Sequence, residues 1–151
     1  MFAKLDIPFV FKRRPAPVPG DLRPAWRIAL ILLILFNSRQ KKASLRKLHV
    51  MSWATRSSIN RHTLLRYSKG DVSKDQIIPR VEPSLNRAID LARGEGLVHI
   101  DKGKNLTLAE EGLKAAEELD KQNDFMEEEK TFLSEIKSFA TEGNIDGLLT
   151  W

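Results

Sequence analysis

The sequence contains no cysteine among its 151 residues. Disulfide bonds and cysteine-based zinc sites are therefore excluded. This composition is typical of a protein from a reducing compartment, so we expect a cytoplasmic location. Hydrophobic residues make up 42% of the chain, which is enough to bury a core. The length fits one domain with an appendage.

The sequence also lacks an apolar run long enough to cross a membrane. Its longest run extends from Ile28 to Phe36, between Arg27 and Asn37, whereas a spanning helix needs about 20 apolar residues. The run begins after a proline-rich stretch and no small-residue cleavage site follows it, so we do not expect a signal peptide. A helix that is apolar on every side lies at the centre of a domain, which predicts a buried core helix from about Pro24 to Ser38.

Catalytic motifs are missing as well. The histidines His49, His62 and His99 are isolated, and the sequence has no HxxxH motif, nucleophile elbow or Walker-type phosphate loop. His49 lies in an apolar stretch, which is more typical of a hydrogen-bonded core histidine than of a metal ligand. The consecutive carboxylates at 127–129 fan around a helix instead of converging. We therefore predict no enzymatic activity, no catalytic residue, no metal site and no cofactor.

Charge is distributed unevenly along the chain. Residues 1–108 carry 21 Lys and Arg against 8 Asp and Glu, whereas residues 109–151 carry 4 against 12. A basic body with an acidic C-terminal part indicates two different kinds of contact, although a solvated face is an equally good explanation of each charge run.

Hydrophobic periodicity and turn signals predict the remaining elements. Residues 39–43 are expected to form a basic loop, and Ser44 is a good N-cap for the second helix. The other expected elements are a third helix at about 58–68, a short strand at 77–81, a helix at 83–94, strands at 97–100 and 106–108 joined by a hairpin turn, a helix at 107–119, an amphipathic helix that includes 125–139, and a short helix at about 144–150.

This order of helices followed by a β-hairpin with a basic tip predicts a mainly α fold, namely a winged helix-turn-helix domain with a C-terminal helical extension. We divide the chain into an N-terminal strand or arm with a proline-rich linker (1–23), a winged-helix domain (24–120) and a C-terminal helical interaction segment (121–151). Winged helices bind DNA, RNA or protein, so the fold alone does not determine the function.

Basic side chains lie on the candidate recognition helix, on the hairpin and near the start of the second helix. Arg39, Arg46 and Lys47 belong to the last of these groups. Asn86, Arg87 and Asp90 would have to face a major groove for base reading, and Asp90 would repel phosphate there, so we favour backbone contact without sequence choice, or none. The candidate DNA contacts are Arg80, Arg87, Arg93, Lys102, Lys104, Lys41 and Lys42.

Two apolar features are candidates for binding a partner. One is the IPFVF stretch at 7–11, which is either an edge strand or a docked arm, and the other is the aromatic stripe of the acidic C-terminal segment. That segment either folds back on its own domain or lies along a partner, and the sequence leaves both open. The candidate partner-binding residues are Phe125, Phe132, Ile136, Phe139, Leu148, Leu149, Trp151, Phe9 and Phe11.

Three stretches of the chain resemble a known family. RPAWR at 23–27, the apolar helix after it and SLRKLHVMSWATRS at 44–57 are similar to the pattern "RPAWR, apolar helix, SLxxLHVLNWALRS" of the small middle components of bacterial ABC-three-component systems, the class that includes Lamassu. Residues 80–112 and 132–151 resemble the later segments of that family. Met51 and Ser52 depart from the more usual Leu-Asn.

The resemblance implies a non-catalytic accessory subunit of an anti-phage or anti-plasmid defence complex. Its partners would be an SMC/Rad50-like ATPase, an effector nuclease and possibly double-stranded DNA, without a membrane. Two alternatives remain open, a free winged-helix transcription regulator and, with less support, a ribosome- or RNA-associated adaptor. A regulator predicts a homodimer on a short palindromic site, whereas a subunit predicts co-purification with a large ATPase.

Overall fold

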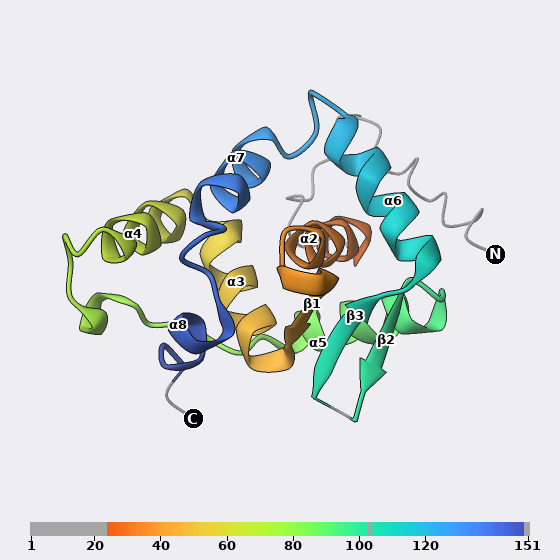
Figure 1. Cartoon of the computed structure of the whole chain (residues 1–151), viewed down its shortest axis with the longest axis horizontal. Coiled ribbons are helices and arrows are strands. Elements are labelled where there is room, and N and C mark those ends of the chain that lie inside the picture. The colour runs from red at the N-terminus through yellow and green to blue at the C-terminus, as the bar shows by residue number, and fades with distance from the viewer. Residues whose placement is uncertain (1–23, 103, 150–151) are drawn as a thin grey trace.

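The computed structural model describes residues 24–102 and 104–149, and the predictions for the 7–11 strand, the proline-rich linker and Trp151 lie outside the described residues. Helices dominate, with one small antiparallel sheet (Figure 1). In chain order the elements are α2 (Pro24–Phe36), η3 (Arg39–Lys41), β1 (Lys42–Ser44), α3 (Leu45–Arg56), α4 (Ser58–Ser68), η4 (Lys74–Gln76), α5 (Pro83–Gly94), β2 (Val98–Asp101), β3 (Asn105–Leu108), α6 (Glu110–Lys121), α7 (Glu127–Ile136) and α8 (Glu142–Asp146).

Helix α2 is the centre of the fold, as its apolar sequence predicts. Every residue from Ala29 to Leu35 is at most 3% exposed. Helices α3, α5, α6 and α7 and strands β1 and β3 all contact it, and Figure 1 shows it nearly end-on among them. Among the described residues, no helix has the length and apolarity that crossing a membrane requires.

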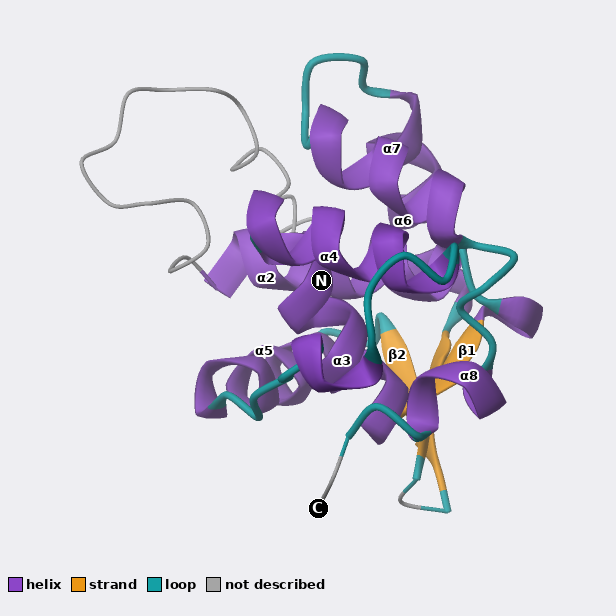
Figure 2. Ribbon diagram, turned by 90° about the vertical axis from the view of Figure 1, so that its left-hand side faces the viewer, coloured by secondary structure: helices purple, strands orange, loops and turns teal. Residues whose placement is uncertain are grey.

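The sheet has the strand order β1-β3-β2, so the last strand along the chain lies in the middle. Both pairings are antiparallel, and Leu106 of β3 faces Ala43 on one side and Ile100 on the other. The buried Leu106 and Leu108 alternate with half-buried neighbours, which is the pattern of a strand with one face on the core. Figure 2 shows the β2–β3 turn projecting away from the helices.

Helices α3 and α4 begin at the predicted residues, and a serine side chain caps each of them. The hydroxyl of Ser44 accepts a hydrogen bond from the backbone N–H of Lys47, so α3 begins where the sequence placed it. Ser57 caps α4 in the same way through the N–H of Asn60.

Three local predictions are wrong. The 77–81 stretch is not a strand, because it pairs with none of the three strands of the described sheet, although the buried Ile77 and the exposed Ile78 alternate as strand residues would. The basic loop at 39–43 includes the start of β1, whose three residues are too few to show alternation. Helix α6 begins at Glu110 instead of 107, because Thr107 and Leu108 pair with β1 and β2.

A close approach of backbones at Gly112 fixes α6 on the sheet. The N–H of Ala109 donates to the carbonyl oxygen of Leu97 at 2.9 Å, which brings the first turn of α6 onto that residue. A Cβ at position 112 would lie 2.0 Å from the same oxygen and 3.2 Å from the Cδ2 atom of Leu108. Only glycine allows this contact without a shift of backbone.

We expect Gly112→Ala to lower the free energy of unfolding by about 2 kcal/mol, because α6 must move off the sheet. Gly94→Ala is the matched control, since a Cβ there meets nothing within 4 Å and alanine favours a helix by up to about 1 kcal/mol. Urea denaturation of both variants provides the measurement. Equal stabilities would contradict the close approach.

Candidate nucleic-acid interface

A charged cluster sets the position of α5, the candidate recognition helix. Glu82, its N-cap residue, accepts from the Nη2 atom of Arg27 on α2 at 3.0 Å and from the Nη2 atom of Arg56 on α3 at 2.6 Å. Arg27 is only 4% exposed, whereas the Glu82 side chain keeps 31% of its surface exposed, so this contact is partly buried. Pro83 follows as the first helical residue, where its missing N–H costs nothing. One carboxylate therefore joins three helices at the start of α5.

His49 extends this cluster toward the exposed side of α5. Burial lowers the pKa of His49 below its usual value, while a hydrogen bond with the side chain of Asn86 and the negative charge of Glu82 act in the opposite direction. The imidazole is therefore neutral at pH 7 and serves as a hydrogen-bonded core group. Asn86, which the sequence offered for base reading, is engaged by this histidine.

The five cations predicted on α5 and the hairpin are all exposed, but Arg80 lies in the loop before α5 and not on either element. We call them the basic wing surface: Arg80, Arg87, Arg93, Lys102 and Lys104. Lys102 adopts a φ of 52° at the hairpin turn, and the N–H of Lys104 closes that turn on the carbonyl oxygen of Asp101 at 3.0 Å. Helix α5 contacts β2, the first strand of the hairpin.

Carboxylates reduce the positive charge of the basic wing surface. Asp90, Glu95 and Asp101 are exposed on the same elements, and Asp90 lies 3.9 Å from the guanidinium of Arg93. The exposed side of α5 also carries Leu91, which is 48% exposed. Such a surface can touch phosphates through its cations, but its chemistry does not suit reading of base edges.

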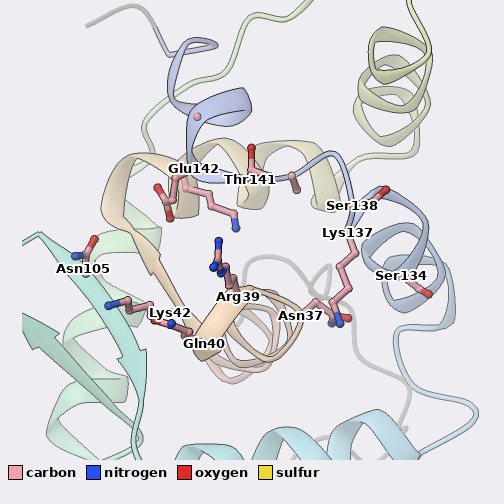
Figure 3. Close-up of a pocket in the computed structure, with 13 residues that line it drawn as sticks. Asn37, Arg39, Gln40, Lys42, Asn105, Ser134, Lys137, Ser138, Thr141 and Glu142 are labelled. Carbon is pink, nitrogen blue, oxygen red and sulfur yellow. The ribbon is translucent and has the colours of Figure 1, made fainter.

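The structure separates the two remaining DNA-contact candidates. The ammonium of Lys41 donates to the carbonyl oxygen of Phe36 at 3.1 Å and lies 4.8 Å from the centre of its ring, so it caps the end of α2. Lys42, one residue later, is exposed. Its side chain lines a depression of the surface (Figure 3).

That depression, which we call the basic pocket, lies between the end of α2, β1, the start of β3 and the C-terminal helices. Its volume is about 1080 Å³. Four cations and one carboxylate line it together with polar side chains: Arg39, Lys42, Lys47, Lys137, Glu142, Asn37, Gln40, Asn105, Ser134, Ser138 and Thr141. Sequence reasoning missed Lys137, because it lies in an acidic stretch that shows no sign of facing β1.

The aromatic stripe of the C-terminal segment turns inward, which is the fold-back arrangement that the sequence left open. Of the candidate partner-binding residues, four are at most 4% exposed: Phe132, Ile136, Leu148 and Leu149. Phe139 is half-buried and meets the ring of Tyr67 edge-on at 5.9 Å, and Phe125 is half-buried beneath the ammonium of Lys130. These side chains form core in this structure and do not make an exposed stripe. Phe9, Phe11 and Trp151 lie outside the described residues.

Ion pairs hold the same segment in place. Arg46 of α3 donates to Asp146 at 2.6 Å and to the carbonyl oxygen of Leu149 at 2.8 Å. Arg61 of α4 donates to Glu128 at 2.8 Å and to the carbonyl oxygen of Thr55 at 2.7 Å. Part of the acidic C-terminal charge is therefore matched within the chain, and Arg46 is not available for phosphate as its position in the sequence had suggested.

Comparison with protein families, with curated proteins and with solved structures finds no match to this chain. Its function is therefore inferred from the geometry of the site and from the sequence resemblance. Among the described residues, no group of histidine and carboxylate side chains is placed to hold a metal ion.

We expect Glu82→Gln to lower the free energy of unfolding by about 2 kcal/mol, because the amide removes the negative charge that two partly buried guanidinium groups contact. Glu95→Gln is the matched control, an exposed carboxylate at the other end of α5, and should change stability by less than about 0.5 kcal/mol. Chemical denaturation measures both. A small, equal effect of the two variants would show that the cluster does not hold α5.

Proposed function

We propose that residues 24–120 form a winged helix-turn-helix domain. The supporting observation is the order α2, β1, α3, α5, β2, β3 together with the sheet order β1-β3-β2, since a winged helix places a short first strand beside the last strand of its hairpin. Helix α4 is then an insertion between the second helix and the recognition helix. In this assignment α5 occupies the recognition position and the β2–β3 hairpin is the wing.

The chain acts, in this proposal, as a non-catalytic accessory subunit that binds an SMC/Rad50-like ATPase, and with it an effector nuclease and DNA, in an anti-phage or anti-plasmid defence complex. This role follows from the resemblance over residues 23–151, of which LHVMSWATRS at 48–57 is the most specific part. The buried Leu48, Trp53 and Ala54 of that stretch hold α3 in the core. The resemblance thus carries the role, and the basic wing surface supplies a place for DNA.

The basic wing surface supports contact with the DNA backbone more than operator recognition. Its cations are exposed, but its helix also presents the apolar Leu91 and the carboxylate of Asp90, which repels phosphate, and Asn86 is engaged by His49. A free regulator is for this reason the weaker alternative.

Phosphate contact by the basic wing surface makes duplex affinity depend on salt. We expect the quadruple change of Arg87, Arg93, Lys102 and Lys104 to Glu to weaken duplex binding of the assembled complex and to make its salt dependence shallower, by about 0.9 in log–log slope for each phosphate that the variant no longer neutralises. Titration of a labelled duplex at several salt concentrations measures this slope.

The control for that change reverses four exposed cations elsewhere, namely Arg66, Lys69, Lys74 and Lys121. It changes the net charge by the same amount, so it separates a local contact from general attraction. Identical slopes for the two quadruple variants would remove DNA contact from the proposal and leave the basic wing surface as a protein interface or a solvated face.

Membership of a complex has a separate test. We expect the full chain, when co-expressed with an SMC/Rad50-like ATPase encoded beside its gene, to co-purify with it at a fixed ratio through size-exclusion chromatography. A homodimer that ignores the ATPase and binds a short palindrome would instead establish the regulator alternative.

A further inference from the structure

The basic pocket gathers four cations around a single carboxylate. Arg39, Lys42 and Lys137 are exposed at its walls, and none of the residues that the structure describes forms an ion pair with them. They come from three separate places, η3, β1 and the residue after α7. Figure 3 shows Arg39 near the middle of the pocket, with Lys42 and Asn105 on one side and Lys137, Ser134 and Ser138 on the other.

The one carboxylate of the pocket is already engaged. Glu142 accepts from the backbone N–H of Ser44 at 2.9 Å, and its charge acts on Lys47, which is 4% exposed and donates to the hydroxyl of Ser38 at 3.3 Å. Burial lowers the pKa of Lys47 while Glu142 raises it in part. Glu142 thus faces a buried lysine, and it leaves the three exposed cations at the walls without a counter-charge.

The chain holds the basic edge of the pocket in an uncommon backbone conformation. Gln40 and Lys41 both have a φ of 57°, which is rare for residues other than glycine. Hydrogen bonds fix this turn on both sides, from the N–H of Lys41 to the carbonyl oxygen of Ser38 and from the N–H of Lys42 to that of Arg39. Strain of this kind persists where the surroundings enforce it, and it concentrates at ligand sites. Here the turn places Arg39 and Lys42 on the same pocket.

The remaining lining defines which anion would fit. Amides and hydroxyls of Asn37, Asn105, Ser134, Ser138 and Thr141 supply hydrogen-bond donors around the cations. None of the described lining residues is aromatic, so the pocket offers no platform on which a nucleobase can stack. A volume of about 1080 Å³ is larger than one phosphate and admits several linked ones.

We propose that the basic pocket binds the linked phosphates of a polyanion, with Arg39, Lys42 and Lys137 as the charged ligands and the surrounding amides and hydroxyls as neutral donors. The guanidinium of Arg39 can hold two phosphate oxygens at once, whereas the lysines act as point charges. The phosphates belong either to a free polyphosphate or nucleotide or to a single nucleic-acid strand, and in both cases they are recognised without the base. The pocket adjoins the hairpin, because its Asn105 follows Lys104, but none of its three charged ligands belongs to the basic wing surface.

The test uses the full chain and the double variant Arg39→Ala/Lys137→Ala. Both side chains are exposed, so the variant should keep the wild-type thermal midpoint. We expect inorganic tripolyphosphate, measured by isothermal titration calorimetry at low salt, to bind the wild-type chain and to bind the double variant at least about tenfold more weakly, since each charge-assisted contact is worth more than a factor of ten.

The matched control is Arg66→Ala/Lys121→Ala, which removes the same two charges from exposed positions outside the pocket. It should bind tripolyphosphate as the wild type does. No binding of tripolyphosphate to the wild-type chain, or equal affinities of the two double variants, would overturn the proposal.

Two further probes separate the sources of the phosphates. Adenosine triphosphate that binds as tightly as tripolyphosphate, and more tightly than oligothymidylate, assigns the pocket to a free polyphosphate group. Oligothymidylate that binds more tightly than either, with weaker binding to the pocket variant, assigns it to a nucleic-acid strand. The pocket variant keeps all five cations of the basic wing surface, so we expect it to keep duplex affinity through that surface, and failure of one site does not entail failure of the other.

Discussion

Burial of α2 is the constraint on which the rest of the structure depends. A helix with seven consecutive residues at most 3% exposed has no side that can face water, so it must be enclosed completely. Helices α3, α5, α6 and α7 and the sheet supply that enclosure. A three-stranded sheet and one helix layer would leave part of α2 open, and α7 of the C-terminal segment helps to close it. For this reason the segment is structural in part, whatever else it binds.

Burial of α2 leaves polar groups at both of its ends that need partners. Near its start, Arg27 is buried and needs a counter-charge, which Glu82 provides; the same carboxylate then fixes the first turn of α5. At its end, the last carbonyl groups need donors, and Asn37, Ser38 and Lys41 supply them to Leu33, Ile34 and Phe36. The tight turn that delivers Lys41 also places Arg39 and Lys42 at the basic pocket. One buried helix thus sets the position of both candidate sites.

The sequence predicts well what depends on near neighbours. The Ser44 cap, the apolar run of α2 and the turn between β2 and β3 are local signals, and the structure places each close to the predicted residues. Strand β1 has only three residues and exists because β3 pairs with it, so no local pattern reveals it. The stripe of Phe132 and Ile136 shows which side of α7 is apolar, but not that α2, α3 and α4 cover that side. The basic pocket is harder still to predict, because its walls meet through contacts between distant residues. Ser44 and Glu142, for example, are 98 positions apart.

The charge asymmetry of the sequence takes on a different meaning in three dimensions. Acidic residues after 109 do not form a detached face, because Asp146, Glu128 and Glu142 lie against Arg46, Arg61 and Lys47 of the basic body. Arg46 and Lys47, which the sequence had offered for phosphate contact, are engaged by these carboxylates, whereas other cations stay exposed at the hairpin and at the basic pocket. The pocket has walls from both parts of the chain, with Arg39 and Lys42 from the body and Lys137 from the C-terminal segment. A polyanion bound there would contact both parts at once, and would therefore favour the arrangement in which the segment lies against α3. The C-terminal segment therefore forms one wall of the basic pocket, and its acidic side chains hold that wall against the basic residues of the body.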